Sequence, residues 1–210
     1  VAIAMRNYPE WMSAFIGIAT LGAVAVPLNS WGQARELAFQ LEDAGARALF
    51  CDQQRCDQLA THLAQSGTPA IVARPSGAGL PGDARSLGDF IADIDDTAFP
   101  AVELDPEDPA LMMYTSGTTG TPKGGLSTQR AVCQSLVNID CQAMASAMVN
   151  PEAIGAMMKK GYPPTQMLAV PLFHVSGCHA AFLAALRSGR RIVMMYKWDV
   201  QKALELIERE

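Results

Sequence analysis

The chain has 210 residues, of which half are hydrophobic, and this suits one large globular domain or one and a half smaller ones. Its net charge of −5 argues against a broad nucleic-acid surface, so we expect no nucleic-acid partner. The best candidate for a membrane span, residues 15–28, is too short and is interrupted by Gly17, Gly22 and Pro27. We therefore expect no integral membrane segment.

Apolar runs alternate with helical patterns over the first 73 residues. The runs predict strands at 1–5, 24–26, 48–51 and 70–73. The patterns between them predict helices at 10–21, 34–44 and 53–65. This alternation predicts an α/β fold, with a layered, mainly parallel sheet and flanking helices.

Residues 74–109 lose this rhythm, because proline, glycine and aspartate dominate there, and they leave one short helical piece at 87–91. The stretch from Gly77 to Gly82 spells a dinucleotide-binding fingerprint. Pro81 lies within it and no long helix follows, so a connecting loop is the better interpretation.

A strand at 111–114 then leads into Thr115-Ser116-Gly117-Thr118-Thr119-Gly120-Thr121-Pro122-Lys123-Gly124. Glycines let backbone N–H groups approach anionic oxygens, hydroxyls donate further hydrogen bonds, and the lysine adds positive charge. The loop is therefore a candidate polyphosphate site, although composition alone would also suit a surface loop. It is not a Walker A loop, because Pro122 occupies the place of its second glycine.

The rest of the chain predicts a return strand at 124–128, a long helix at 130–148 and a boundary or surface insertion at 150–166. A second unit follows, with strands at 167–170 and 191–195 and an apolar helix at 177–188. Asp199 is expected to cap a last helix. We thus predict a first subdomain at 1–145, a connecting segment at 146–164 and the beginning of a second α/β subdomain at 165–210.

The string at 115–124 resembles the signature of the adenylate-forming (AMP-binding) superfamily, which includes acyl-CoA synthetases, luciferases and peptide-synthetase adenylation domains. That signature reads [Thr/Ser]-Ser-Gly-[Ser/Thr]-Thr-Gly-x-Pro-Lys-Gly, and every defined position is met. Downstream, Gly125 and Gln129 replace the common Val and His. The resemblance implies that the loop binds the β- and γ-phosphates of ATP and that Lys123 is catalytic. The implied ligands are Thr115, Ser116, Gly117, Thr118, Thr119, Gly120 and Lys123.

Pro171-Leu172-Phe173-His174-Val175-Ser176-Gly177 similarly resembles the family's Pro-[Leu/Met]-Phe-His-x-x-[Gly/Ala] motif. By this resemblance Phe173 and His174 lie beside the acyl carboxylate and the thiol tunnel. His174 is thus a candidate catalytic residue, and both are candidate substrate contacts. The alternative is a histidine that only satisfies its own loop.

Cysteine and histidine positions bear on metals and on the cellular compartment. The five cysteines, an odd number, predict reduced thiols and a cytoplasmic location. His174, Cys178 and His179 are close in sequence, but no second ligand pair completes a metal site, so we expect no protein-held metal.

The implied function is that of an ATP-dependent acyl-CoA synthetase. It would use Mg²⁺ and coenzyme A to activate a small carboxylic acid through an acyl-adenylate. The alternatives are a non-catalytic relative that binds nucleotide or acyl chains, and an unrelated phosphotransferase, which would release ADP. Fatty, aromatic and short-chain acids are all compatible with these residues.

We expect the chain to be a fragment of the family's large N-terminal domain and to be inactive by itself. It starts without Met in a strand, ends within a helical pattern, and lacks the family's adenine, ribose and catalytic-lysine elements. An incomplete second unit would leave an apolar face of the 177–188 helix exposed. Such a face would favour a homo-oligomer.

Overall fold

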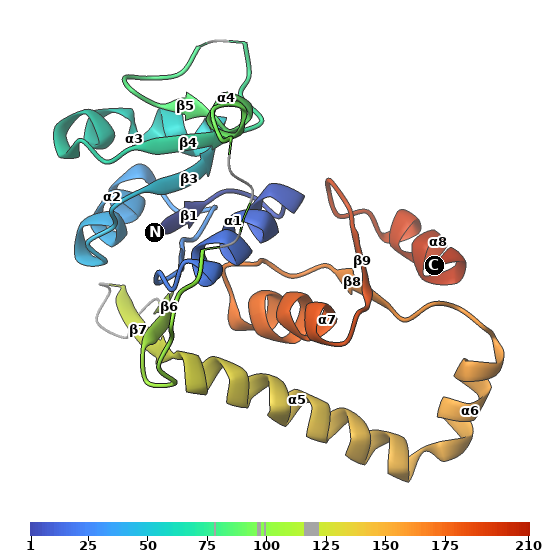
Figure 1. Cartoon of the computed structure of the whole chain (residues 1–210). Coiled ribbons are helices and arrows are strands. Elements are labelled where there is room, and N and C mark those ends of the chain that lie inside the picture. The colour runs from blue at the N-terminus through green and yellow to red at the C-terminus, as the bar shows by residue number, and fades with distance from the viewer. Residues whose placement is uncertain (78, 96–97, 99, 116–121) are drawn as a thin grey trace. The chain divides into compact units, whose positions relative to one another are not determined.

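The computed structural model describes residues 1–77, 79–95, 98, 100–115 and 122–210, except for the side chain of Met157. The chain divides into two compact units, Val1–Gln129 and Arg130–Glu210 (Figure 1). The functional domain boundaries expected at residues 145 and 165 stay predictions.

The first unit is built on a parallel sheet with the strand order β2-β1-β3-β4-β5. Its strands are β1 (Ala2–Ala4), β2 (Val26–Pro27), β3 (Leu49–Asp52), β4 (Ala70–Ala73) and β5 (Arg85–Ser86). Every neighbouring pair is parallel, so the predicted α/β class is confirmed. Strand β5 was not expected, because two polar residues carry no hydrophobic pattern.

Four helices belong to this sheet: α1 (Pro9–Thr20), α2 (Ala34–Asp43), α3 (Gln53–Ser66) and α4 (Leu87–Ala92). Leucines of α2 and α3 pack in one buried cluster with β1, β3 and β4. Figure 1 shows α1 on the opposite side of the sheet from α2 and α3. The parallel strands are therefore covered on both faces, as such sheets require.

A hairpin follows, formed by β6 (Pro109–Thr115) and β7 (Lys123–Thr128), which pair antiparallel. The hairpin is attached to the first sheet through Ala25, which immediately precedes β2. The Ala25 N–H donates to the Ala110 carbonyl at 3.0 Å. The Met112 N–H donates in turn to the Ala25 carbonyl at 2.9 Å. The predicted hairpin beside the first sheet is thus confirmed.

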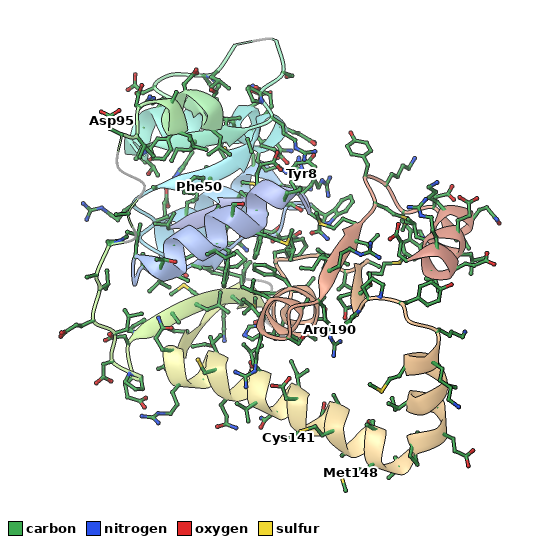
Figure 2. The ribbon with its side chains drawn as sticks, turned by 45° about the vertical axis from the view of Figure 1, so that its right-hand side comes forward. Tyr8, Phe50, Asp95, Cys141, Met148 and Arg190 are labelled. Atoms are coloured by element: carbon green, nitrogen blue, oxygen red, sulfur yellow. The ribbon has the colours of Figure 1, made fainter. Side chains whose placement is uncertain are left out.

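The second unit contains two parallel strands and a succession of helices. The strands are β8 (Thr165–Leu168) and β9 (Arg191–Met194). The helices are α5 (Gln129–Val149), α6 (Pro151–Lys159), the π-helix η1 (Ser176–Leu183), α7 (Ala184–Arg187) and α8 (Val200–Arg209). No residue of α5, which is described in full, is buried. Figure 2 shows Cys141 and Met148 projecting from it.

Two expectations for the second unit are wrong. The sequence predicted an irregular segment at 150–166, but α6 occupies much of it, because Pro151 stands at the first helical position, where its missing N–H costs nothing. The 177–188 helix was expected to expose an apolar face, but most of it is buried. Its small side chains allow close approach. The buried residues are Gly177, Cys178, His179, Ala181, Phe182, Ala184 and Ala185.

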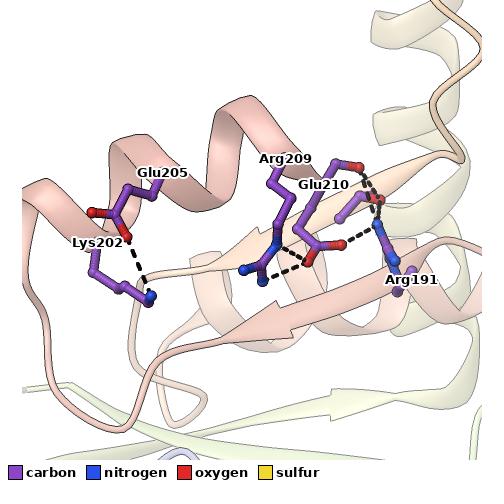
Figure 3. Close-up of polar contacts among 6 residues, drawn as sticks. Arg191, Lys202, Glu205, Arg209 and Glu210 are labelled. Carbon is purple, nitrogen blue, oxygen red and sulfur yellow. Dashed lines mark hydrogen bonds and ion pairs between the residues drawn. The ribbon is translucent and has the colours of Figure 1, made fainter.

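Ion pairs fix the end of α8 against β9. The Glu210 carboxylate lies 2.6 Å from Arg191 Nη2 and 2.7 Å from Arg209 Nη2 (Figure 3). The Glu210 carbonyl also accepts hydrogen bonds from Arg191 at 3.1 Å and from the Thr165 hydroxyl at 3.2 Å. The last residue of the chain is therefore held against both strands of the small sheet.

Candidate functional site

The two ends of the predicted phosphate loop face each other across the hairpin. Thr115, the last residue of β6, is the register partner of Lys123, the first residue of β7, and both are exposed. Register partners in an antiparallel pair lie about 4.5–5.5 Å apart, so the mouth of the loop is narrow and fixed. The other predicted ligands lie outside the described residues; they are Ser116, Gly117, Thr118, Thr119 and Gly120.

Gly124, which ends the motif, has a packing role. It is the register partner of Tyr114. A Cβ atom at Gly124 would lie 2.9 Å from Met112 Sδ and 3.3 Å from Tyr114 Cζ. The side chains of Met112 and Tyr114 therefore lie against the Gly124 backbone. A larger residue would displace them beside Lys123.

Tyr114 ties the hairpin to α2 through its hydroxyl group. The hydroxyl donates to Asp43 Oδ2 at 2.6 Å and lies 3.3 Å from the Gln40 carbonyl oxygen. Burial, followed by the hydrogen bond to Asp43, raises the pKa of Tyr114 well above its usual value. Sequence reasoning missed both residues, because a tyrosine in an apolar strand carries no sign of its partner.

Phe173 and His174 lie side by side in the turn that precedes η1. Their ring centroids are 4.6 Å apart and their planes are inclined by 42°. The His174 N–H donates to the Pro171 carbonyl at 3.1 Å, and the His174 carbonyl accepts from Cys178 N at 2.8 Å. Phe173 is half-buried and His174 is exposed. The turn therefore presents an accessible imidazole over an apolar ring.

Gly177 allows this turn to form. A Cβ atom there would lie 2.0 Å from the Pro171 carbonyl oxygen and 2.6 Å from its carbon. No side chain fits at these distances without a shift of the backbone. The small residue that ends the second motif is thus explained by the close approach of η1 to Pro171.

Cys178 and His179 follow in η1 and are both buried. Burial raises the pKa of the Cys178 thiol to about 12, so this group is a poor nucleophile at neutral pH. Burial also lowers the pKa of His179, which favours its neutral form. No group of three or more candidate metal ligands occurs among the described residues.

The structure thus brings the predicted site residues together as two pairs. Thr115 and Lys123 form one pair in the first unit, and Phe173 and His174 form the other in the second. The catalytic and binding roles assigned to them remain predictions. Lys123 and His174 are both exposed, as groups that meet a ligand must be.

Solved structures of adenylate-forming enzymes share this fold. ATP-bound MatB from Rhodopseudomonas palustris aligns with 99% of the chain at a TM-score of 0.75 and 24% identity, and the alignment covers 37% of MatB. The inhibitor-bound N-terminal domain of FACL13 from Mycobacterium tuberculosis aligns with 98% of the chain at a TM-score of 0.68 and 27% identity, covering 46% of that domain's chain. The α/β architecture is therefore that of acyl-activating enzymes.

The chain belongs to the family described as AMP-binding enzymes, whose model matches residues 1–210. Among its relatives, the long-chain-fatty-acid–CoA ligase FadD13 of Mycobacterium tuberculosis is 32% identical over the whole chain. 4-Coumarate–CoA ligase 2 of Oryza sativa subsp. japonica is 26% identical, also over the whole chain. The chain spans 37% and 36% of the lengths of these two ligases. Its relatives are thus CoA ligases of acyl and aryl acids.

Proposed function

We propose that the full-length protein is an AMP-forming acid–thiol ligase that converts a small carboxylic acid into its coenzyme A thioester. The hairpin supports this proposal most directly, because it sets Lys123 and Thr115 at the mouth of a Gly/Ser/Thr-rich loop. The identity of the relatives as CoA ligases gives independent support.

In the first step, a carboxylate oxygen attacks the α-phosphorus of ATP, and the bond to pyrophosphate breaks. No protein nucleophile is required for this step, so the protein must position the reactants and stabilise the charge on the phosphates. Lys123 carries its ammonium group on an exposed strand end, and it would neutralise charge on the leaving pyrophosphate.

In the second step, the thiol of coenzyme A attacks the acyl-adenylate and AMP leaves. Phe173 would provide an apolar wall for the acyl group. The exposed His174 imidazole beside it would contact the carboxyl group of the acid, which is free in the first step and joined to AMP in the second. The buried Cys178 is not needed as a nucleophile, since coenzyme A supplies the thiol.

Magnesium fits this proposal without a carboxylate cluster on the protein. Mg²⁺ usually keeps several waters and binds substrate phosphates. The described residues offer no group of three candidate ligands. Nucleotide phosphates and water would be among the ligands of the ion. When bound, the ion would offset negative charge on the phosphates.

We place the reaction in the cytoplasm, because the five cysteines are all free thiols. None of the described helices has the length and apolar character to cross a bilayer.

Pyrophosphate exchange tests the proposal. The full-length protein is incubated with ATP, Mg²⁺ and labelled pyrophosphate, together with a panel of fatty, aromatic and short-chain acids. We expect label to enter ATP only when an accepted acid is present, and acyl-CoA and AMP to form when coenzyme A is added.

Two results would contradict the proposal. Release of ADP instead of AMP and pyrophosphate would indicate a phosphotransferase. Nucleotide or acyl binding without exchange for any acid would indicate the non-catalytic relative.

A further inference from the structure

A short hydrogen bond joins the hairpin to α2 beside the candidate site. Tyr114 Oη donates to Asp43 Oδ2 at 2.6 Å, within the range for a hydroxyl bound to a carboxylate. Such charge-assisted bonds are stronger than neutral ones. Tyr114 immediately precedes Thr115, and its register partner Gly124 immediately follows Lys123. The bond therefore acts on the Tyr114–Gly124 pair, which is next to the Thr115–Lys123 pair at the mouth of the loop.

Asp43 occupies an unfavourable position for a carboxylate. It is the last residue of α2, and that helix has no basic residue in its last turn. A negative charge at a helix C-terminus is destabilising, because it lies at the negative end of the helix dipole. The hydroxyl of Tyr114 is the compensating partner that the structure provides.

The tip of the hairpin needs such an attachment. Toward its base, β6 is bonded to Ala25 through Ala110 and Met112. Over its last three residues, Met113 to Thr115, β6 pairs with β7. The side chain of Tyr114 packs on the core of the first sheet and reaches Asp43 from this outer part. Without the bond, the outer part would be held mainly by β7 and could pivot about Met112.

We propose that Tyr114 and Asp43 are positioning residues of the nucleotide site. Their hydrogen bond holds the outer part of the hairpin against α2 and thereby fixes Lys123 relative to the first sheet. The inference rests on the proposed adenylation activity. It predicts that the bond affects the use of ATP through Lys123 and has little effect on the acid.

Steady-state kinetics of the full-length protein test the assignment. In Tyr114→Phe the ring remains over Gly124 but the hydroxyl is lost. We expect KM for ATP to rise roughly three- to tenfold, the effect of losing one net hydrogen bond. KM for the acid should stay within about twofold, and Asp43→Ala should match Tyr114→Phe. Tyr196→Phe is the matched control, because that side chain is 92% exposed.

A double-mutant cycle separates positioning from general destabilisation. If Tyr114 acts through Lys123, Tyr114→Phe should have almost no further effect on KM for ATP in a Lys123→Ala background. A purely structural effect would instead add to that of Lys123→Ala and would raise both KM values. Asp43→Asn keeps an acceptor oxygen, so it should raise KM for ATP less than Asp43→Ala does.

Each outcome has a distinct meaning. Lack of acid-dependent exchange in the unaltered protein overturns the proposed function, and the positioning role with it. If the unaltered protein shows normal exchange but Tyr114→Phe and Tyr196→Phe have the same KM for ATP, the positioning role alone is overturned. Additive effects of Tyr114→Phe and Lys123→Ala also overturn it.

Discussion

Lys123 is the described residue on which the proposed chemistry depends most. Lys123→Ala in the full-length protein should slow acid-dependent pyrophosphate exchange by about tenfold to a thousandfold, the range for removing one charge-stabilising group. Its exposed side chain contributes little to folding, so the free energy of unfolding should change by less than about 0.5 kcal/mol. Lys160→Ala, also at an exposed lysine, is the control and should leave exchange unchanged.

The pKa of Tyr114 should lie well above the usual value for a tyrosine. A free tyrosine has a pKa of about 10, and burial and Asp43 raise that of Tyr114. The raised pKa stabilises the fold below the unfolded value of about pH 10, and this contribution is lost as the pH rises through the folded value. An alkaline titration of phenolate absorbance should show a late step that is absent from Tyr114→Phe. A titration unaltered by this substitution would contradict the assignment.

Gly177 should tolerate no side chain. Gly177→Ala brings a methyl group onto the Pro171 carbonyl and should cost about 1–3 kcal/mol, as overpacking does. The turn that carries Phe173 and His174 should shift with it. Gly155→Ala is the control, because a methyl group on this residue of α6 would have nothing within 4 Å, and it should be neutral or stabilising. Equal urea-denaturation midpoints for the two variants would refute this account.

The sequence located the candidate residues but not the contacts between them. Lys123 and His174 were identified because their motifs are local strings, which a resemblance can detect. The Tyr114–Asp43 bond joins residues that are distant in sequence, and no periodic pattern encodes such a pair. The clash that selects Gly177 is likewise visible only once the Pro171 carbonyl has been placed.

Among the elements, α8 depends on its cap. The Asp199 carboxylate accepts a hydrogen bond from Lys202 N at 2.8 Å. Asp199→Ala should therefore destabilise the second unit by about 1 kcal/mol, whereas Asp199→Asn, which keeps an acceptor, should cost less. Chemical denaturation followed by circular dichroism measures both changes. Equal losses in the two variants would show that charge rather than capping is involved.

Elements with strong hydrophobic periodicity were predicted well, whereas elements with weak periodicity were not. The strands β1, β3 and β4 and the helix α3 were expected close to their observed bounds, since buried runs and an amphipathic stripe are direct consequences of burial. The strand expected at 24–26 shares only Val26 with the observed β2. The helix α6 was missed because its proline and glycine suggested a loop. The sequence did not distinguish the π-helix from an α-helix, because the two forms differ in which backbone carbonyl each N–H group bonds, and a short apolar run carries no sign of that difference.

For the whole molecule, we expect residues 1–210 alone to form no acyl-CoA from ATP, Mg²⁺, coenzyme A and an accepted acid. The chain spans little more than a third of the length of the ligases FadD13 and 4-coumarate–CoA ligase 2. Elements for adenine, ribose and the catalytic lysine were not found in its sequence. A chromatographic assay for the thioester decides the point, with the full-length protein as the positive control. Thioester formed by residues 1–210 would show that those elements are dispensable.

The strand order β2-β1-β3-β4-β5 also has a consequence for folding on the ribosome. The strand β1 is synthesised before the others but lies inside the sheet, between β2 and β3. Its two edges stay unpaired until Val26 and then Leu49 have left the exit tunnel. Parallel pairing of this kind requires loop closure before it yields any contact, so it is slow. The nascent first unit therefore exposes an apolar strand edge during synthesis, and unpaired edges of this kind are prone to aggregation.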